Sequence, residues 1–175
     1  MLETLRPHIA NVTVVYSETL GQLGGSGISI WLSQYAVISN AVVKLAKQCG
    51  ISISSSWVTT VSDTVVLYAE FAGICISSSQ NSTISRTVVM HTQQVGMFFA
   101  SSYNTDIVDT TVSHSGIYGL TMESVHHLAV SNTTVTVSSQ IGITVFNSTH
   151  IAFFQYIWDI LRHKGVYWCY ANTHR

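Results

Sequence analysis

Apolar residues alternate with other residues after seven glycines that lie 23 positions apart along the chain. These glycines are Gly27, Gly50, Gly73, Gly96, Gly119, Gly142 and Gly165. The second position after each glycine, with the glycine counted as the first, is Ile28, Ile51, Ile74, Met97, Leu120, Ile143 or Val166, and the fourth is Ile30, Ile53, Ile76, Phe99, Met122, Val145 or Trp168. Because side chains two positions apart in a strand share a face, the pattern predicts a strand after each glycine, with these residues in the interior.

Two further apolar positions in each unit predict two more strands. The first of them holds Ile38, Val61, Ile84, Ile107, Val130 and Phe153, and the second holds Val43, Val66, Val89, Val112, Val135 and Trp158. A fixed period of this size is typical of a solenoid, and the period-two spacing with many β-branched residues argues against helical repeats. The sequence therefore predicts an all-β parallel solenoid of about six to seven coils, with three short strands per coil.

Small polar residues recur between the predicted strands. The seventh position holds Ser33, Ser56, Ser79, Ser102 and Ser148, and the fifteenth holds Thr64, Thr87, Thr110 and Thr133. Such residues suit bends because they hydrogen-bond to nearby backbone, and identical hydroxyls stacked about 4.8 Å apart can also bond to one another along the stack. The glycines fit a bend that needs either a positive φ or a close approach of backbones.

The sequence predicts one domain over residues 1–175, which the 23-residue period divides into coils. We expect an irregular first coil over 1–26 with a loop at 18–26, six regular coils over 27–164, and an incomplete last coil over 165–175. A β-helix needs its end coils covered, because open strand edges invite association. The sequence thus predicts a fragment of a longer protein.

The repeated unit G-I-x-I-x-x-S resembles the right-handed parallel β-helix repeat of the pectin-lyase-like superfamily. Residues 73–79 and 107–112 carry this likeness. The resemblance implies the fold, but the superfamily includes lyases, hydrolases, phage tailspikes, adhesins and receptor ectodomains, so it does not define a function. Residues 11–16, followed by Gly21-Gln22, are also similar to the β-helical ectodomains of fibrocystin-like receptors, which implies a piece of a large single-pass receptor.

Charge is scarce in this sequence. Only 9% of residues are charged and the net charge is −1, against about 25% charged residues in ordinary domains. This composition offers no electrostatic attraction for nucleic acid or an anionic membrane, and no apolar run reaches the roughly 18 residues that span a bilayer. We therefore expect neither nucleic-acid binding nor a membrane segment.

Four N-glycosylation sequons, at Asn11, Asn81, Asn132 and Asn147, favour an extracellular or cell-surface protein. Chance in a chain rich in Asn, Ser and Thr is the alternative explanation. Residues 1–6 lack the basic and apolar segments of a signal peptide.

Three cysteines, Cys49, Cys75 and Cys169, show neither metal-ligand spacing nor an even framework. The sequence therefore predicts three free thiols and no cofactor.

Few residues offer catalytic chemistry. Asp106, Asp109 and Glu123 are the only carboxylates expected near one another on consecutive coils, and glycoside hydrolysis needs two across one sugar. Asn104-Thr105-Asp106 matches the first short motif of polygalacturonase-like hydrolases, but no Asp-Asp, Gly-His-Gly or Arg-Ile-Lys segment follows. The sequence favours a non-catalytic protein.

The fourteenth position places Arg86 between Asp63 and Asp109 of the neighbouring coils. This charge ladder is expected to favour correct register between coils; a binding spot for a polar ligand is the alternative.

Two pairs of histidines share a position in consecutive coils. His91 and His114 lie at the nineteenth position and are predicted to point inward, whereas His127 and His150 lie at the ninth, near a solvent-exposed bend. Because a zinc site needs three or four ligands, we expect no metal.

The leading functional hypothesis is a non-catalytic segment that serves as a rigid spacer and recognition surface. The outer face of the first strand would bind a polysaccharide or a protein through aromatic and acidic side chains: Trp31, Phe98, Glu123, Phe146 and Tyr167. The alternatives are a polysaccharide lyase or glycoside hydrolase, and a surface that binds a repeating lattice such as ice.

Overall fold

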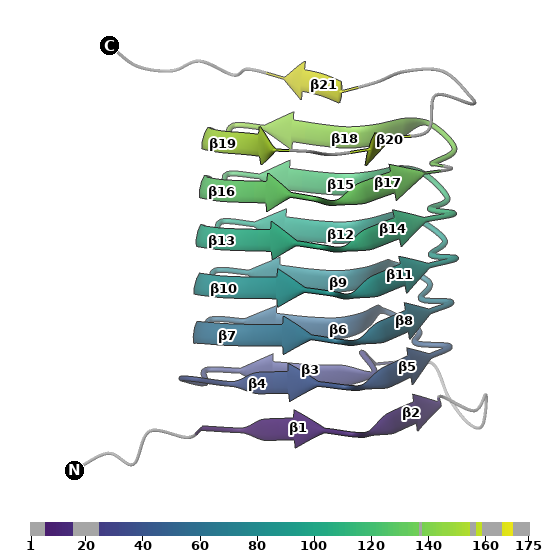
Figure 1. Ribbon diagram of the computed structural model, residues 1–175, viewed down its shortest axis with the longest axis vertical. Helices are drawn as coiled ribbons and strands as arrows, with labels where there is room; N and C mark the ends of the chain where they lie inside the picture. Colours follow the sequence, from purple (N-terminus) through teal and green to yellow (C-terminus); the bar gives the residue numbers. More distant parts are fainter. Residues whose placement is uncertain (1–5, 16–24, 137, 155–156, 159–165, 170–175) are drawn as a thin grey trace.

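The computed structural model is a right-handed parallel β-helix built from three parallel sheets of seven strands each (Figure 1). It describes residues 6–15, 25–136, 138–154, 157–158 and 166–169. Within these ranges every regular element is a strand, so they contain no helix long and apolar enough to cross a membrane. The predicted fold class is confirmed.

Each coil contributes one strand to each sheet. Sheet 1 contains β1 (His8–Ala10), β4 (Val37–Ser39), β7 (Trp57–Ser62), β10 (Gln80–Ser85), β13 (Tyr103–Val108), β16 (His126–Ser131) and β19 (Thr149–Phe154). Sheet 2 contains β2 (Thr13–Val15), β5 (Val42–Lys44), β8 (Val65–Leu67), β11 (Val88–Met90), β14 (Thr111–Ser113), β17 (Thr134–Thr136) and β20 (Ile157–Trp158). Sheet 3 contains β3 (Ile28–Trp31), β6 (Cys49–Ser54), β9 (Ala72–Ser77), β12 (Val95–Ala100), β15 (Tyr118–Glu123), β18 (Ile141–Phe146) and β21 (Val166–Cys169).

The strand register follows the 23-residue period. Ile84 pairs with Val61 on one side and with Ile107 on the other. At the N-terminal end Ile9 pairs with Ile38, a separation of 29, so six extra residues lie between β2 and β3. Strands β3–β17 make five coils in which every strand is described, with partial coils before and after, against the predicted six to seven.

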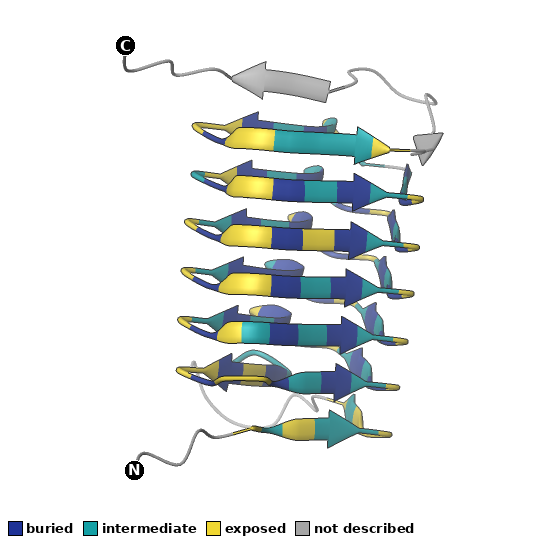
Figure 2. Ribbon diagram, turned by 60° about the vertical axis from the view of Figure 1, so that its left-hand side comes forward, coloured by how far each residue is buried: buried dark blue, intermediate teal, exposed yellow. Residues whose placement is uncertain are grey.

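The core is the stack of inward-facing positions that the sequence pattern predicts. Along β6, β9 and β12 the second and fourth positions of the repeat, counted from the glycine, are buried. On the foreground strands in Figure 2, which belong to sheet 1, buried residues alternate with intermediate or exposed ones. The largest fully buried side chains are Phe99, Ile38, Ile51, Ile53, Ile74, Ile76, Ile84, Met97, Ile107, Leu120, Met122 and Leu128. Burial of these side chains between neighbouring coils drives the folding of the solenoid.

Left-handed backbone conformations turn the chain at four positions of the coil. Positive φ angles occur at the sixth position (Leu32, Ser55, Ser78, Ser101, Ser124, Asn147), the ninth (Tyr35, Val58, Asn81, Asn104, His127, His150), the fourteenth (Asn40, Asp63, Arg86, Asp109, Asn132) and the nineteenth (Leu45, Tyr68, His91, His114). The backbone ladder continues through these positions; for example, the Arg86 N–H donates to the Val108 carbonyl at 3.1 Å.

The serine and threonine positions are buried inside the bends rather than exposed on them. The Ser56 hydroxyl donates to the Ser54 carbonyl at 2.9 Å and accepts the Ser33 backbone N–H at 3.2 Å. The Thr64 hydroxyl likewise donates to the Ser62 carbonyl at 2.8 Å. These hydroxyls therefore bond to nearby backbone, as predicted, both within their own coil and to the coil below. These hydrogen bonds do not join one hydroxyl to another along the stack.

The recurrent glycines lie within or beside the strands of sheet 3, and close approach of neighbouring atoms is what requires them. A Cβ on Gly73 would lie 2.1 Å from Cγ1 of Val89 and 2.8 Å from the carbonyl oxygen of Gly96. The same two contacts recur at Gly27, Gly50, Gly96 and Gly119. Of the two reasons for glycine that the sequence left open, close approach is confirmed and a positive φ is not.

We expect Gly73→Ala to lower the free energy of unfolding by about 2–3 kcal/mol, because the added methyl group overpacks the core against Val89 and a fixed carbonyl. Urea denaturation followed by circular dichroism measures the loss. Ser29→Ala is the control, because Ser29 is an exposed, outward-facing residue of β3 in the same sheet. Equal losses in the two variants would contradict this account of the glycine position.

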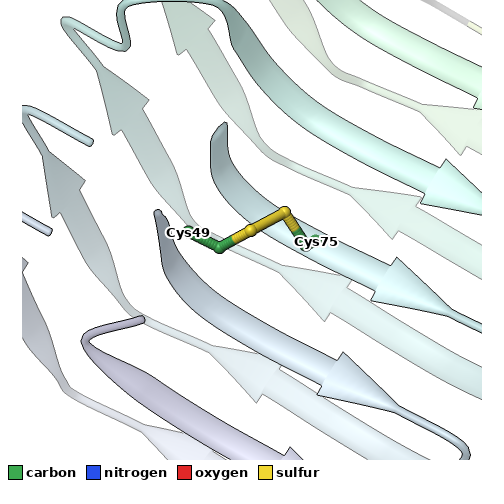
Figure 3. Close-up of a disulfide and its surroundings, with 2 residues drawn as sticks. All are labelled: Cys49 and Cys75. Atoms are coloured by element: carbon green, nitrogen blue, oxygen red, sulfur yellow. A yellow bond between two sulfur atoms is a disulfide. The ribbon is translucent and has the colours of Figure 1, made fainter. Parts of the chain in front are cut away.

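A disulfide joins Cys49 to Cys75, so the prediction of free thiols is wrong for these two residues (Figure 3). Because Gly50 lies inside β6 instead of at a bend, Cys49 begins that strand, and Cys75 lies on the adjacent β9 with 6.1 Å between the two Cα atoms. The bridge packs outside sheet 3 in a small cluster with Ala72, Val95 and Phe98. The side chain of Cys169 lies outside the described residues.

The disulfide closes a loop with a sequence separation of 26, and loop-closure entropy predicts that its loss costs about 3.5 kcal/mol. We expect chemical denaturation under reducing conditions, or of a Cys49→Ser/Cys75→Ser variant, to show this decrease. Peptide mapping without reduction should recover residues 49 and 75 in one cross-linked fragment. Recovery of both as free thiols would contradict the structure.

The prediction that His91 and His114 point inward is also wrong. Both are exposed, because their left-handed backbone turns the side chains away from the core. Tyr68 stacks on His91 with ring centroids 5.1 Å apart, and His91 lies 4.7 Å from His114. These three rings form an external stack at the bend between sheets 2 and 3.

Candidate functional site

A groove of about 430 Å³ lies on the outer surface of sheet 1, across β10, β13, β16 and β19. It crosses the strands, so each coil contributes equivalent positions to it. Its lining residues are Asn81, Ser82, Thr83, Asn104, Asp106, His127, Leu128, Ala129, His150 and Ala152. The exposed starts of the sheet 1 strands, which border this groove, are visible in Figure 2.

One wall of the groove is a stack of side chains at the ninth position. Asn104 Nδ2 donates to Asn81 Oδ1 at 3.1 Å. His127 stacks on His150 with ring centroids 4.4 Å apart and an interplanar angle of 13°. Because each side chain rests on its neighbour, the wall presents amides and imidazole edges in fixed positions.

A second row, at the eighth position, supports this wall. The Tyr103 ring meets His127 edge-on at 5.0 Å and lies 6.4 Å from His126. The Nδ1 of His126 is hydrogen-bonded to Oγ1 of Thr149 at 2.7 Å. The row therefore restricts the rotation of the ring that lines the groove.

The floor of the groove is the eleventh position, where the strands face outward. Thr83, Asp106, Ala129 and Ala152 are consecutive partners in the sheet register. Ala129 and Ala152 are much smaller than the imidazoles of His127 and His150 beside them, and this difference in side-chain size makes the groove deep. Among the described residues that line the groove, Asp106 is the only one with a formal charge.

The left-handed conformation at the ninth position explains why the wall stands above the floor. Asn81, Asn104, His127 and His150 have φ between 52° and 56°, a conformation in which Asn and His are enriched among non-glycine residues. The turn lifts these side chains out of the strand alternation. Val58 and Tyr35 continue the same position toward the N-terminus, also with φ near 54°.

A smaller hollow of about 240 Å³ continues the eighth and ninth positions below the groove, lined by Gln34, Tyr35, Trp57 and Val58. Trp57 is 51% exposed and Tyr35 is 48% exposed. The Arg6 guanidinium lies 4.8 Å from the centre of the Tyr35 ring. We call the groove and this hollow together the ninth-position edge. Its N-terminal end presents the rings of Tyr35 and Trp57, and its C-terminal end presents the imidazoles of His127 and His150.

The ninth-position edge offers hydrogen-bond donors and acceptors, exposed ring faces and one carboxylate. Within the described residues no group of three or more His, Cys, Asp or Glu side chains could hold a metal ion. Asp106 and the stacked imidazoles His127 and His150 share the groove, and together they could accept and donate protons on a bound ligand.

The family model described as right handed beta helix region matches residues 8–156. The chain belongs to the right-handed β-helix family. No curated protein sequence gives a significant match to it.

Three solved structures illustrate how widely this β-helix is shared. The periplasmic alginate epimerase AlgG is similar with a TM-score of 0.80 and 14% identity, over 87% of this chain and 39% of that one. The pectate lyase Pel9A matches with a TM-score of 0.64 and 13% identity, over 86% and 44%. The enzymatically active domain of bacteriophage CBA120 tailspike protein 2 matches with 0.63 and 12%, over 92% and 32%. The β-helix thus spans less than half the length of these structures, and the likeness concerns the fold.

Several residues were predicted from the sequence to bind one ligand on the first-strand face, but they lie apart in the structure. Glu123 and Phe146 are register partners at the C-terminal ends of β15 and β18, and both are exposed. Trp31 is 68% exposed but lies at the same position four coils below Glu123. Phe98 packs against the disulfide cluster, and the side chain of Tyr167 lies outside the described residues.

The carboxylates proposed as catalytic candidates lie on separate parts of the coil. Asp106 is on the outer face of β13, Asp109 is at the bend between β13 and β14, and Glu123 ends β15 in sheet 3. Asp109 accepts a hydrogen bond from Asn132 Nδ2 at 2.5 Å. Of the three, Asp106 alone lines the groove.

Of the three residues in the predicted charge ladder, Arg86 and Asp63 form an ion pair. The Arg86 guanidinium makes two hydrogen bonds to Asp63, Nε to Oδ1 at 2.7 Å and Nη2 to Oδ2 at 2.9 Å. The hydrogen bond from Arg86 holds the pKa of Asp63 below its ordinary value, and Asp63 together with Asp109 raises the pKa of Arg86. Both side chains are exposed, so salt screens the pair.

We expect the Asp63 carboxyl to titrate below the ordinary value of about 3.9 and to move up toward it in Arg86→Gln. NMR titration of the side-chain carboxyl carbon measures both. Because the folded-state pKa is lowered, the stabilisation is present above the ordinary pKa and is lost as the pH falls through the folded-state value. An unchanged midpoint in Arg86→Gln would contradict the assigned cause.

The sequence pointed to the histidines of the ninth position but not to the groove. It placed His127 and His150 together near a bend after Asn81 and Asn104, and this placement is correct. It did not connect them with Asp106, two positions further along the coil than Asn104. The available signal was the run of small residues Thr83, Ala129 and Ala152 at the eleventh position.

Proposed function

We propose that this β-helix is a carbohydrate-recognition segment of a larger extracellular or cell-surface protein, and that it binds its ligand along the ninth-position edge. The observation that carries the proposal is the aromatic and amide edge itself. Trp57 and Tyr103 are 51% and 43% exposed, and they occupy the same position two coils apart.

The spacing of these rings suits a sugar chain that runs along the helix axis. Two coils correspond to about 10 Å, because neighbouring strands are about 4.8 Å apart. That distance is comparable with the length of two linked sugar units. A sugar ring can stack on an aromatic face while its hydroxyl groups bond to the Asn and His side chains between and beyond the two rings.

Three further observations support this proposal. The Cys49–Cys75 disulfide suits an oxidising, extracytoplasmic compartment. The sequon residues Asn11, Asn132 and Asn147, which do not line the groove, are exposed. The structural neighbours include an alginate epimerase that is described as periplasmic, and a pectate lyase.

The non-catalytic role is supported by the scarcity of charged groups at the edge. Glycoside hydrolysis uses two carboxyl groups about 5–9.5 Å apart, and the groove is lined by one, Asp106. No observation in the structure favours the lattice-binding alternative. The outward positions of sheet 3 hold Thr121 and Thr144 but are interrupted by the disulfide and Phe98.

A second candidate function is a proton-transfer reaction on a polysaccharide, as in a lyase. It is favoured by the presence of Asp106, His127 and His150 in one groove. A carboxylate or a neutral imidazole is a suitable base for a carbon-bound proton beside a carboxyl group. Release of unsaturated ends from alginate or pectate by the protein, and its loss in Asp106→Asn, would establish this function in place of the first.

We expect the Trp57→Ala/Tyr103→Ala variant to bind polysaccharide roughly 5–10-fold more weakly than the native chain, because it loses two stacking faces. Affinity electrophoresis through gels that contain neutral or acidic polysaccharides measures the change. Trp31→Ala is the matched control, since Trp31 is 68% exposed but lies on sheet 3. An equal effect of the control would move the site to the first-strand face, and retention of full binding by the double variant would overturn the proposed edge.

A further inference from the structure

We propose that the groove selects sugar chains without acidic groups and rejects polyuronates such as alginate and pectate. This inference rests on the proposed carbohydrate function and assigns its substrate class. It begins from the charge of the lining. Nine of the ten residues that line the groove are Asn, Ser, Thr, His, Leu or Ala, and the tenth is Asp106.

A ligand that occupies the groove must lie beside Asp106. This residue is exposed on β13, its register partners are Thr83 on one side and Ala129 on the other, and it therefore occupies the middle of the floor. None of the described hydrogen bonds or ion pairs engages its carboxylate. A uronate residue placed here would bring a second carboxylate close to that of Asp106, and no Lys or Arg among the described residues lines the groove.

The basic side chains of the described residues are placed where they do not offset this charge. The Arg86 guanidinium is paired with Asp63 beyond the end of β10. Lys47 forms an ion pair with Glu70, and Lys44 belongs to sheet 2. Arg6 lies over Tyr35, in the hollow three coils below Asp106. Three coils correspond to about 14 Å, which exceeds the Debye length of about 8 Å at physiological ionic strength.

The rest of the lining matches hydroxyl and amide groups of a sugar chain. Asn81 and Asn104 each carry a donor and an acceptor, and the His127 and His150 rings each present ring nitrogens. Such groups bond to neutral hydroxyls without a net charge. The Asp106 carboxylate can accept hydrogen bonds from two vicinal hydroxyls, so it contributes to binding of a neutral sugar while it opposes an acidic one.

The decisive experiment compares oligosaccharides of equal length and different charge. Isothermal titration calorimetry at pH 8 would use hexamers of a neutral β-1,4-linked glucan or xylan, of galacturonate and of mannuronate, at low and at physiological salt. We expect the neutral hexamers to bind at least about tenfold more tightly than the uronates, with the difference larger at low salt because screening is weaker.

Asp106→Asn keeps the size of the side chain and one acceptor oxygen, replaces the other oxygen by an amide donor, and removes the charge. We expect it to raise affinity for the uronate hexamers by about tenfold and to change affinity for the neutral ones by less than threefold. Glu123→Gln is the matched control, because it removes an exposed carboxylate from sheet 3 and is expected to change neither. Both variants replace exposed side chains, and circular dichroism confirms that they fold.

The outcomes separate this inference from the proposed function. Equal or tighter binding of uronates by the native protein overturns the selectivity but leaves carbohydrate recognition in place. The same follows if Asp106→Asn fails to raise uronate affinity, or if Glu123→Gln raises it equally. Failure of every hexamer to bind, together with no effect of Trp57→Ala/Tyr103→Ala in affinity electrophoresis, overturns the proposed function itself.

Discussion

Backbone hydrogen bonds between successive coils are the interaction on which the rest of this structure depends. They run through the strands and through the left-handed bends alike, so each residue is held above the residue 23 positions earlier. The glycines permit this stacking, because a Cβ at Gly73 would meet both Val89 and the carbonyl of Gly96. Any residue that widened one coil would break the ladder above and below it.

This constraint gives the side chains their partners. A residue meets its equivalent in the next coil, which is why asparagine bonds to asparagine and imidazole stacks on imidazole along the groove wall. Arg86 shows the limit of the rule. It has an aspartate at the same position on both sides but hydrogen-bonds with Asp63, while Asp109 bonds to Asn132. Stacking of the coils determines which side chains are neighbours, and local geometry determines which of these neighbours form a hydrogen bond.

The groove arises from the difference between two neighbouring positions of the coil. The ninth position turns outward because its backbone is left-handed, and the eleventh carries small residues on the sheet surface. Repetition then extends this local difference across four strands, β10, β13, β16 and β19. A binding surface of this kind needs no long loops, and its chemistry changes one coil at a time, from aromatic rings near Trp57 to imidazoles near His150. The single carboxylate at Asp106 stands out because so little charge surrounds it.

The sequence by itself determined the solenoid, its period, its three strands per coil and most of its core, because these follow from apolar residues that repeat at a constant interval. It also brought His127 next to His150 and Asp63 next to Arg86, since both pairs are 23 residues apart. Only the tertiary structure decided where the coil turns. The pattern of apolar residues does not indicate the left-handed backbone at the ninth and nineteenth positions. The exposure of His91 and the groove above Asp106 therefore could not be predicted from it. The same holds for Cys49 and Cys75: their pairing depends on a strand that continues through Gly50, and the spacing of cysteines along the chain carries no information about that path.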